Sequence, residues 1–250
     1  MSLSLSVPPI WVDKPNLLVK ACEEIAKFDA IGIDTESNSL FAYQEQVCLI
    51  QISAREKDYL IDPLSIPDLS PLGNIMADAH IEKVFHAAEY DIICLKRDHN
   101  FKFRSIFDTM HACRILGEAN LGLAAQLEKH FSYVHNKKYQ RADWGKRPLT
   151  EEMLNYARID SHFLVSLRDI LKPQLKEKGL LDLAAEDFAH LIHVEPTPLH
   201  DDPTLVWRII GNSHLPTEKV SILQSLLDYR ENYAIRADTP PFKVLGNDVL

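Results

Sequence analysis

Segments typical of β-strands are concentrated in the first third of the chain, and this order of elements limits the folds that the chain can adopt. Residues 30–36, 46–53 and 58–62 are rich in apolar and β-branched side chains, almost without interruption at 46–53, as expected of a central strand. The short gaps between these segments favour an antiparallel meander. A helical pattern at 69–79 then leads to a fourth strand-like segment at 83–87, which gives one βαβ-like passage.

The pattern between residues 88 and 191 is mostly helical, apart from a short strand-like segment at 104–107. The clearest helix follows Thr150, which can cap its first turn, and an apolar stripe then recurs at spacings of three and four. Asp160 interrupts this stripe, and Pro173 is predicted to end or kink the helix. Strands followed by helices predict an α/β domain with a mixed β-sheet flanked by helices.

The length and composition are typical of a globular chain. With 250 residues, of which 46% are hydrophobic, the chain can bury one large core and carry a smaller appendage. No apolar run approaches the roughly 18 residues of a membrane-spanning helix, and residues 1–10 lack the features of a secretory signal. We therefore expect a cytoplasmic protein that does not bind membranes. We also expect it to be a monomer.

The charge balance and the cysteines narrow the classes of function. The net charge of −9 argues against a protein that simply coats nucleic acid, but it allows an enzyme with a local basic patch. The four cysteines are widely spaced and form no Cys-x-x-Cys pair. We expect free, mostly buried thiols and no zinc site.

A proline-rich, acidic segment divides the chain. Residues 194–206 contain three prolines and are predicted to be a linker. Residues 1–193 would form the main domain, and residues 207–250 a helical segment with an amphipathic helix at 218–237. One helix and a few apolar residues cannot form an independent core, so we expect this segment to be the incomplete start of a second domain.

Acidic residues stand at three places where an ordinary core would carry apolar groups. Asp34 and Glu36 end the first strand-like segment, Asp91 follows the fourth, and Asp160 lies four residues after Tyr156 in the clearest helix. A buried carboxylate without a partner is costly, so it is normally paired, neutralised or bound to a metal. Three such places in one domain suggest a metal centre.

The spacing of these residues fits that interpretation. Asp34 and Glu36 project from one face of a strand, where they would repel each other unless a cation intervenes. Tyr156 and Asp160 share a helix face, and a phenol there can orient an attacking water. Such hard oxygen ligands suit two Mg²⁺ or Mn²⁺ ions rather than zinc, and paired metals can support phosphodiester hydrolysis.

Ordinary structural roles explain each motif taken alone. An Asp-x-Glu pair is usually a solvated edge or loop, and Asp91 would more often cap a helix. The Tyr156–Asp160 spacing is more often packing beside a surface acid. The joint occurrence of the motifs, in this order and on these elements, favours the metal centre.

With these residues the chain resembles the ribonuclease D branch of the DEDD 3′–5′ exonucleases, in the subgroup with tyrosine in the third motif. The resemblance covers roughly residues 10–191 and includes further signatures. These are Cys48-Leu49-Ile50-Gln51-Ile52, Leu60-Ile61-Asp62-Pro63-Leu64, Phe107-Asp108-Thr109 and the stretch from Lys138 to Leu149. The tail resembles the start of an HRDC domain at Trp207-Arg208, Tyr229-Arg230-Glu231, Ala234 and Asp238-Thr239-Pro240, which implies additional grip on nucleic acid.

The resemblance implies a ribonuclease H-like fold and hydrolysis from the 3′ end with release of nucleoside monophosphates. It implies that Asp34, Glu36 and Asp160 hold the metal that activates water. Asp34 would also bridge to a second metal, which Asp91 would support. Tyr156 would position the nucleophile.

Five further residues are candidates for nucleic-acid binding. Residues 137–147 contain five basic residues and one acid, so this segment could attract phosphates and stack bases through interleaved aromatic rings. The candidates are His86, Lys138, Arg141, Trp144 and Arg147. A solvated surface, a core position for Trp144 and a hydrogen-bonded role for His86 at a strand end are the alternatives.

The leading hypothesis is an RNA-directed 3′–5′ exonuclease that trims single-stranded 3′ ends of structured RNAs such as tRNA precursors. A DNA-directed exonuclease of the Werner or proofreading type would use the same five residues. A catalytically inactive nucleic-acid-binding scaffold is the third alternative. It is disfavoured because such scaffolds are expected to lose metal ligands.

Overall fold

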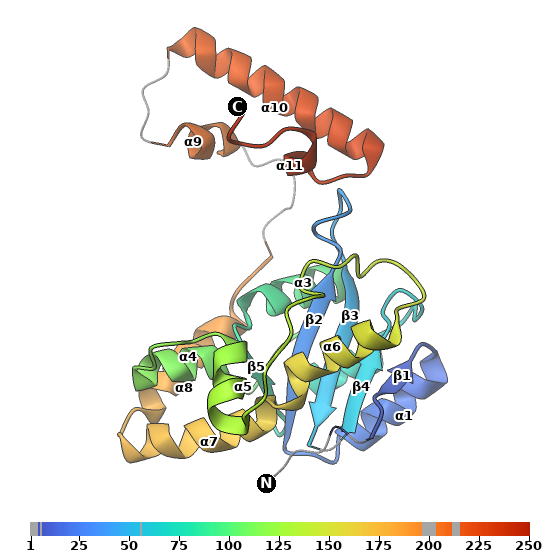
Figure 1. Cartoon of the computed structure of the whole chain (residues 1–250), viewed down its shortest axis with the longest axis vertical. Coiled ribbons are helices and arrows are strands. Elements are labelled where there is room, and N and C mark those ends of the chain that lie inside the picture. Colours follow the sequence, from blue (N-terminus) through green and yellow to red (C-terminus); the bar gives the residue numbers. More distant parts are fainter. Residues whose placement is uncertain (1–4, 6, 56, 197–203, 212–215) are drawn as a thin grey trace. The chain divides into compact units, whose positions relative to one another are not determined.

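A six-stranded mixed sheet forms the core of the larger part of the chain in the computed structural model (Figure 1). The structure describes residues 5, 7–55, 57–196, 204–211 and 216–250. The strands are β1 (Ile10–Val12), β2 (Ala30–Ser37), β3 (Val47–Ala54), β4 (Lys57–Ile61), β5 (Glu82–Phe85) and β6 (Ile106–Asp108). Their order in the sheet is β1-β4-β3-β2-β5-β6. β2, β3 and β4 form an antiparallel meander, while β5 runs parallel to both β2 and β6. The predicted mixed α/β sheet is confirmed.

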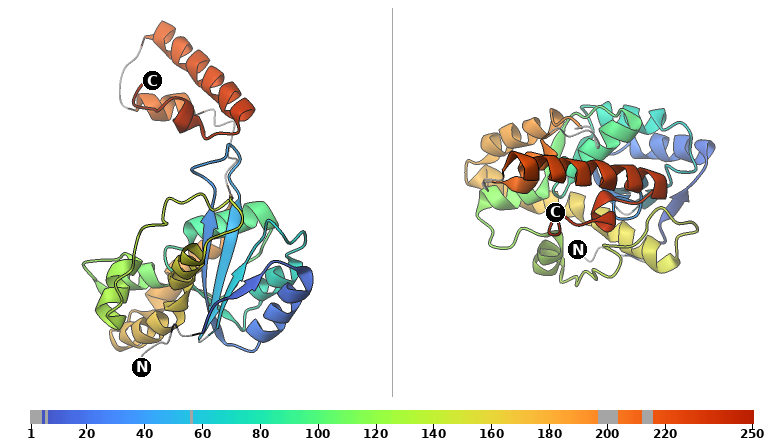
Figure 2. Two further views of the ribbon diagram at one scale, coloured as in Figure 1. Left: turned by 45° about the vertical axis from the view of Figure 1, so that its right-hand side comes forward. Right: turned by 90° about the horizontal axis from the view of Figure 1, so that it is seen from above.

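Helices cover both faces of the sheet. One layer contains α1 (Pro15–Ile25), α2 (Ser70–Ala77) and α3 (Glu89–His99). The other contains α4 (Thr109–Leu116), α5 (Leu123–Phe131), α6 (Glu151–His162), α7 (Leu164–Glu177) and α8 (Leu181–Ile192). Figure 2 shows α6 and α7 on one side of the sheet and α1 on the other. β3 is buried along its whole length because both layers cover it.

Three features of the elements differ from the sequence-based expectation. Strand β1 and helix α1 had not been anticipated. The helix that begins after Thr150 ends at His162, and Phe163 separates it from α7. Pro173 was predicted to end or kink the helix. It lies inside α7, so it does not end it. Thr150 accepts a hydrogen bond from the Met153 N–H at 3.3 Å, as expected of the cap.

The chain divides into two compact units. The first comprises residues 1–37 and 47–196, and the second comprises residues 38–46 and 197–250. The second contains α9 (Leu205–Ile210), α10 (Thr217–Ala237) and α11 (Pro241–Val244). Within it, the Tyr43 N–H donates to Asp238 at 3.1 Å, so the short segment 38–46 belongs to the helical unit. Residues 197–203 of the predicted linker lie outside the described residues.

The cysteines and the membrane prediction can be compared with the described part of the chain. All four cysteines are buried and none of them forms a disulfide, as expected. Among the described residues, no helix is both long enough and apolar enough to cross a membrane.

Candidate active site

Strand β2 carries two of the predicted metal ligands. It pairs with β3 through Asp34 opposite Gln51 and Glu36 opposite Leu49, and the register shifts directly after Glu36. Because side chains alternate along a strand, Gly32, Asp34 and Glu36 share one face of the sheet. This is the face on which α6 packs.

Helix α6 approaches β2 closely at Gly32. A Cβ atom at this position would lie only 2.4 Å from the Ser161 carbonyl oxygen and 3.0 Å from the Leu164 Cβ. Real side chains do not tolerate such a distance to backbone, so glycine allows α6 to reach the sheet. Asp160, the residue before Ser161, is thereby brought to the strand face that carries Asp34.

A buried polar network fixes α6 to the neighbouring strands. The Asp58 carboxylate accepts hydrogen bonds from the Arg158 guanidinium at 2.9 Å and from the Ser53 hydroxyl at 2.7 Å, and lies 2.8 Å from His162 Nδ1. Ser53 also lies 2.7 Å from the Ser161 hydroxyl. Burial would raise the pKa of Asp58, but these partners lower it, so the carboxylate stays ionised beside Arg158.

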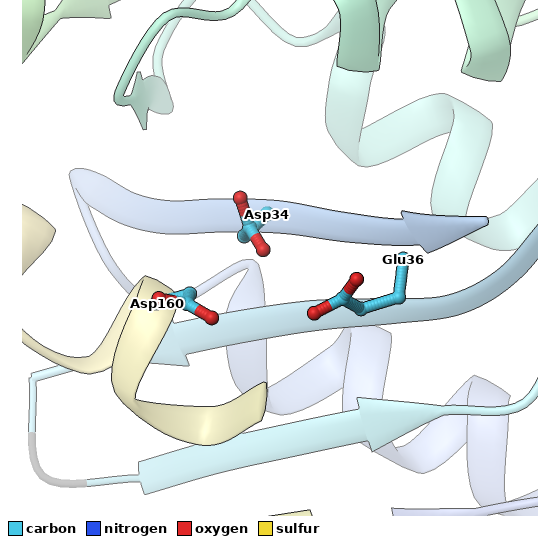
Figure 3. A group of neighbouring side chains, drawn as sticks. All are labelled: Asp34, Glu36 and Asp160. Carbon is cyan, nitrogen blue, oxygen red and sulfur yellow. The ribbon is translucent and has the colours of Figure 1, made fainter. Parts of the chain in front are cut away.

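The structure brings three predicted ligands together. Asp34, Glu36 and Asp160 each present an oxygen within 4.8 Å of the others, and Figure 3 shows the two β2 carboxylates facing the one from α6. Burial, followed by the charges of neighbouring carboxylates, raises the pKa of Asp34 and of Glu36 well above the usual range. Burial also raises the pKa of Asp160.

The donor set of this cluster fits a divalent cation. Three carboxylates converge, and each is costly to ionise beside the others because like charges in a partly dry site repel. A cation removes that cost. Oxygen donors of this type suit Mg²⁺ or Mn²⁺, so Asp34, Glu36 and Asp160 are the residues that would hold such an ion.

Asp91 lies beside this cluster and is held by the neighbouring strand. Its carboxylate accepts a hydrogen bond from the Thr35 hydroxyl at 2.5 Å. Burial, reduced in effect by this hydrogen bond, raises the pKa of Asp91 to about 7. Asp91 contributes to the raised pKa of Asp34, which places the two carboxylates within electrostatic reach of each other.

Asp108 shapes the turn that leads to Asp91. Its buried carboxylate accepts hydrogen bonds from the Ala87 N–H at 3.2 Å and the Ala88 N–H at 2.7 Å, and it caps α4 through Met110 at 2.8 Å. Ala87 has a φ of 66°, a left-handed conformation that is unfavourable for alanine. The hydrogen bonds to Asp108 hold this turn at the start of α3.

Tyr156 faces the carboxylates from α6. Burial, and then the charges of Asp160, Glu36 and Asp34, raise the pKa of its phenol above the usual range, so the hydroxyl keeps its proton at neutral pH. A neutral phenol can donate a hydrogen bond and orient a water molecule. The structure therefore gives Tyr156 the surroundings that the predicted role requires.

His135 was given no role from the sequence, yet it contacts two groups of the site. Its Nε2 lies 3.1 Å from Asp160 Oδ1, and its ring stacks on Tyr156 with centroids 5.2 Å apart and planes inclined by 29°. The side chain is only 7% exposed. No motif spacing reveals this histidine, because it lies in the loop after α5. Thr35 and Gly32 lie on β2 and were also given no role, because their contacts with Asp91 and with Ser161 join segments that are distant in the sequence.

The candidates for nucleic-acid binding have different surroundings. Lys138 and Arg141 are exposed. Trp144 is 1% exposed and packs in a core cluster with Cys48, Leu49 and Leu60.

Arg147 and His86 both have partners within the protein. The Arg147 guanidinium donates to Asp62 at 2.7 Å and to the Cys48 carbonyl at 2.6 Å. His86 Nδ1 lies 2.9 Å from the Thr109 hydroxyl, and burial lowers the pKa of His86 to about 4. Nucleic-acid binding by these residues stays a prediction.

The fold and the cluster define a class of protein, namely nucleases with a carboxylate-lined site on a mixed sheet, and the comparisons with known proteins agree. Residues 9–176 match the family model described as 3′-5′ exonuclease. The chain belongs to this 3′-5′ exonuclease family. Its homologues include the exosome exonuclease RRP6 and ribonuclease D.

The relatives show how much of each protein the similarity covers. The chain is 34% identical to the exosome complex exonuclease RRP6 of Saccharomyces cerevisiae over 97% of its own length and 35% of that protein. It is 30% identical to the ribonuclease D of Desulfotalea psychrophila over 93% of its length and 63% of that protein. The chain therefore spans about a third of the yeast relative.

Two solved structures have the same fold. The catalytic core of RRP6 from Trypanosoma brucei superimposes with a TM-score of 0.88 at 28% identity, covering 98% of this chain and 69% of that one. Escherichia coli RNase D gives a TM-score of 0.77 at 28% identity, with coverages of 96% and 64%. The matches extend over both units of the chain.

Proposed function

We propose that this protein is a metal-dependent 3′–5′ exoribonuclease that hydrolyses RNA from the 3′ end and releases nucleoside monophosphates. The observation that carries the proposal is the convergence of Asp34, Glu36 and Asp160 within 4.8 Å, in a site that Tyr156 also faces. The homologous proteins named RRP6 and ribonuclease D support RNA as the substrate.

Two divalent ions, Mg²⁺ or Mn²⁺, would complete the site. Asp34, Glu36 and Asp160 would hold one ion, and Asp34 with Asp91 would hold the other. Bound metals of this kind activate water and stabilise the leaving oxygen. The chain's own contribution is to hold the carboxylates on β2 and α6, and to place the Tyr156 hydroxyl where it can orient the attacking water.

The natural substrate would be a single-stranded 3′ tail on a structured RNA, such as a tRNA precursor. Exposed Lys138 and Arg141 would attract the phosphate backbone, and the helical second unit would contribute further contacts with the RNA. A DNA-directed 3′–5′ exonuclease is the alternative, because it would use the same carboxylates. An inactive scaffold is disfavoured, because all five motif residues are present.

The test is a 3′-shortening assay on 5′-labelled RNA and on DNA of the same sequence, with Mg²⁺, Mn²⁺ or EDTA. We expect a ladder on RNA that EDTA abolishes. Asp34→Asn should lower the rate by at least about a hundredfold, since metal ions contribute several kcal/mol of charge stabilisation. The variant should still fold, because the removed charge is one that its neighbours disfavour.

Asp29→Asn is the matched control. Asp29 precedes the same strand, but its side chain is 75% exposed and forms a surface ion pair with Arg55 at 3.8 Å. Its rate should equal that of the wild type. Folded wild-type protein that shortens neither substrate would overturn the proposal, and faster shortening of DNA would favour the alternative.

A further inference from the structure

We propose that a cavity beside Tyr156 is a subsite for one nucleobase of the single-stranded RNA substrate, an inference that rests on the proposed function. The cavity has a volume of about 300 Å³. It lies between α6 and the segment after α5. The residues that the argument uses are Tyr133, Asn136, Lys138, Tyr139, Asn155 and Tyr156.

The cavity adjoins the reaction centre. Tyr156 lines it and also lies within electrostatic reach of Asp160, Glu36 and Asp34. His135 likewise lines the cavity and contacts the Asp160 carboxylate. A group bound in the cavity would therefore contact two side chains that also interact with the carboxylate cluster, close to the phosphodiester that is cleaved.

The rings of the lining fit a flat aromatic ligand. Tyr133, Tyr139 and Tyr156 all contribute to it, and the centroids of Tyr139 and Tyr156 are 5.9 Å apart with planes inclined by 66°. Rings at such an angle offer a face and an edge to one ligand. Stacking on aromatic side chains is the usual way in which proteins hold unpaired bases.

The charges of the lining favour an uncharged ligand over a phosphate. The Lys138 ammonium lies 4.9 Å from the centre of the Tyr139 ring, and its charge is balanced by Glu152, which also lines the cavity. A phosphate site would instead concentrate donors and positive charge. The carboxamides of Asn136 and Asn155 can both donate and accept hydrogen bonds, as the edges of bases require.

This assignment gives the basic segment 137–147 a specific role. The sequence suggested base stacking by the interleaved rings of Tyr139 and Trp144 and phosphate contacts by the basic residues. Trp144 is buried and Arg147 is bound to Asp62, whereas Tyr139 and Lys138 border the cavity. The segment would thus contribute a base contact through Tyr139.

The experiment combines protein variants with RNA that lacks a single base. All proteins carry Asp34→Asn, so that the RNA is not shortened, and affinity is measured by fluorescence anisotropy with oligo(A) of about a dozen nucleotides. One base at a time is removed, starting from the 3′ end. We expect one abasic position to raise Kd about tenfold, in line with measured values for base stacking.

In the Tyr139→Leu variant, the intact RNA should bind about tenfold more weakly, and the same abasic position should cause no additional loss. Asn155→Ala, an exposed change on α6, should weaken binding at that position without affecting the fold. Leu183→Ala, at an exposed position on α8 of the first unit, should leave Kd unchanged.

Equal effects of all abasic positions, or additive effects of Tyr139→Leu and the abasic site, would overturn the subsite. These outcomes leave the proposed function intact if the wild-type protein shortens RNA. The converse outcome is that the RNA binds with the expected pattern while the wild-type protein does not shorten it. That result would contradict the proposed nuclease activity but support the cavity as a base-binding site.

Discussion

At the residue scale, His135 connects two parts of the site that perform different tasks. Its imidazole contacts the carboxylate of Asp160 and stacks on the ring of Tyr156. A hydrogen bond to a ligating carboxylate restricts its orientation, and such outer contacts tune metal sites. We therefore regard His135 as a positioning residue.

We expect His135→Ala to weaken Mn²⁺ binding roughly 10- to 100-fold, as is typical when an outer partner of a metal ligand is lost. In His135→Gln, the amide can still donate to Asp160, so part of the Mn²⁺ affinity should return. The stacking on Tyr156 is lost in both variants, so kcat should be lower than that of the wild type in both. Mn²⁺ titration of the exonuclease rate separates the two effects.

The control for these variants is His80→Ala, at an exposed position outside the site, which should behave like the wild type. An unchanged Mn²⁺ requirement in His135→Ala, with the fold intact by circular dichroism, would show that His135 does not position Asp160.

At the scale of elements, the site depends on how closely α6 approaches β2. Gly32 permits this approach, because any Cβ would collide with the Ser161 carbonyl at 2.4 Å. Asp160 precedes Ser161, so a displacement of α6 moves this carboxylate away from Asp34 and Glu36. A displacement of about 1 Å in a catalytic site can reduce the rate about a hundredfold.

We expect Gly32→Ala to lower the exonuclease rate about a hundredfold and the free energy of unfolding by about 1–3 kcal/mol, which is usual for overpacking. Rates and urea denaturation are measured on the same preparation. Gly122→Ala is the control, because no atom lies within 4 Å of its added Cβ and its φ of −66° suits alanine. Full activity of Gly32→Ala would show that a displacement of α6 from β2 does not impair the site.

At the scale of the whole molecule, the carboxylate cluster couples folding to pH and to metal binding. Burial raises the pKa of Asp91 to about 7, whereas an aspartate in an unfolded chain titrates near about 3.9. Between these values the folded state binds more protons than the unfolded state. The stability of the metal-free protein should therefore fall as the pH rises from about 4 to about 7.

Metal binding should reverse this pH dependence of stability, because the carboxylate ligands must lose their protons before they bind the ion. We expect the stabilisation by Mg²⁺ to increase between pH 5 and pH 8, reaching about 2.7 kcal/mol when Mg²⁺ is at a hundred times its Kd. Urea denaturation with EDTA or Mg²⁺ at several pH values measures it. The double variant Asp34→Asn, Glu36→Gln should not be stabilised by Mg²⁺. If Mg²⁺ stabilises the wild-type protein by the same free energy at all pH values, the coupling between proton release and metal binding is contradicted.

Local periodicity was sufficient for much of the fold and for the site's ligands. The strand period of two placed Asp34 and Glu36 on one face, and the helix period placed Tyr156 and Asp160 on another. These relations depend only on backbone geometry, which nearby residues determine. Element ends were less predictable, since Pro173 continues a helix that a rule based on proline alone would end.

The sequence by itself determined which carboxylates share a face and which segments form the central strands, because hydrophobic pattern and side-chain alternation are local properties. Only the tertiary structure decided which faces meet. Packing of α6 on β2 brings Asp160 close to Asp34. Other contacts between distant segments place Thr35 against Asp91 and His135 against Asp160. Packing also buries Trp144. Contacts between distant segments depend on the shape of the whole core, so no local spacing encodes them.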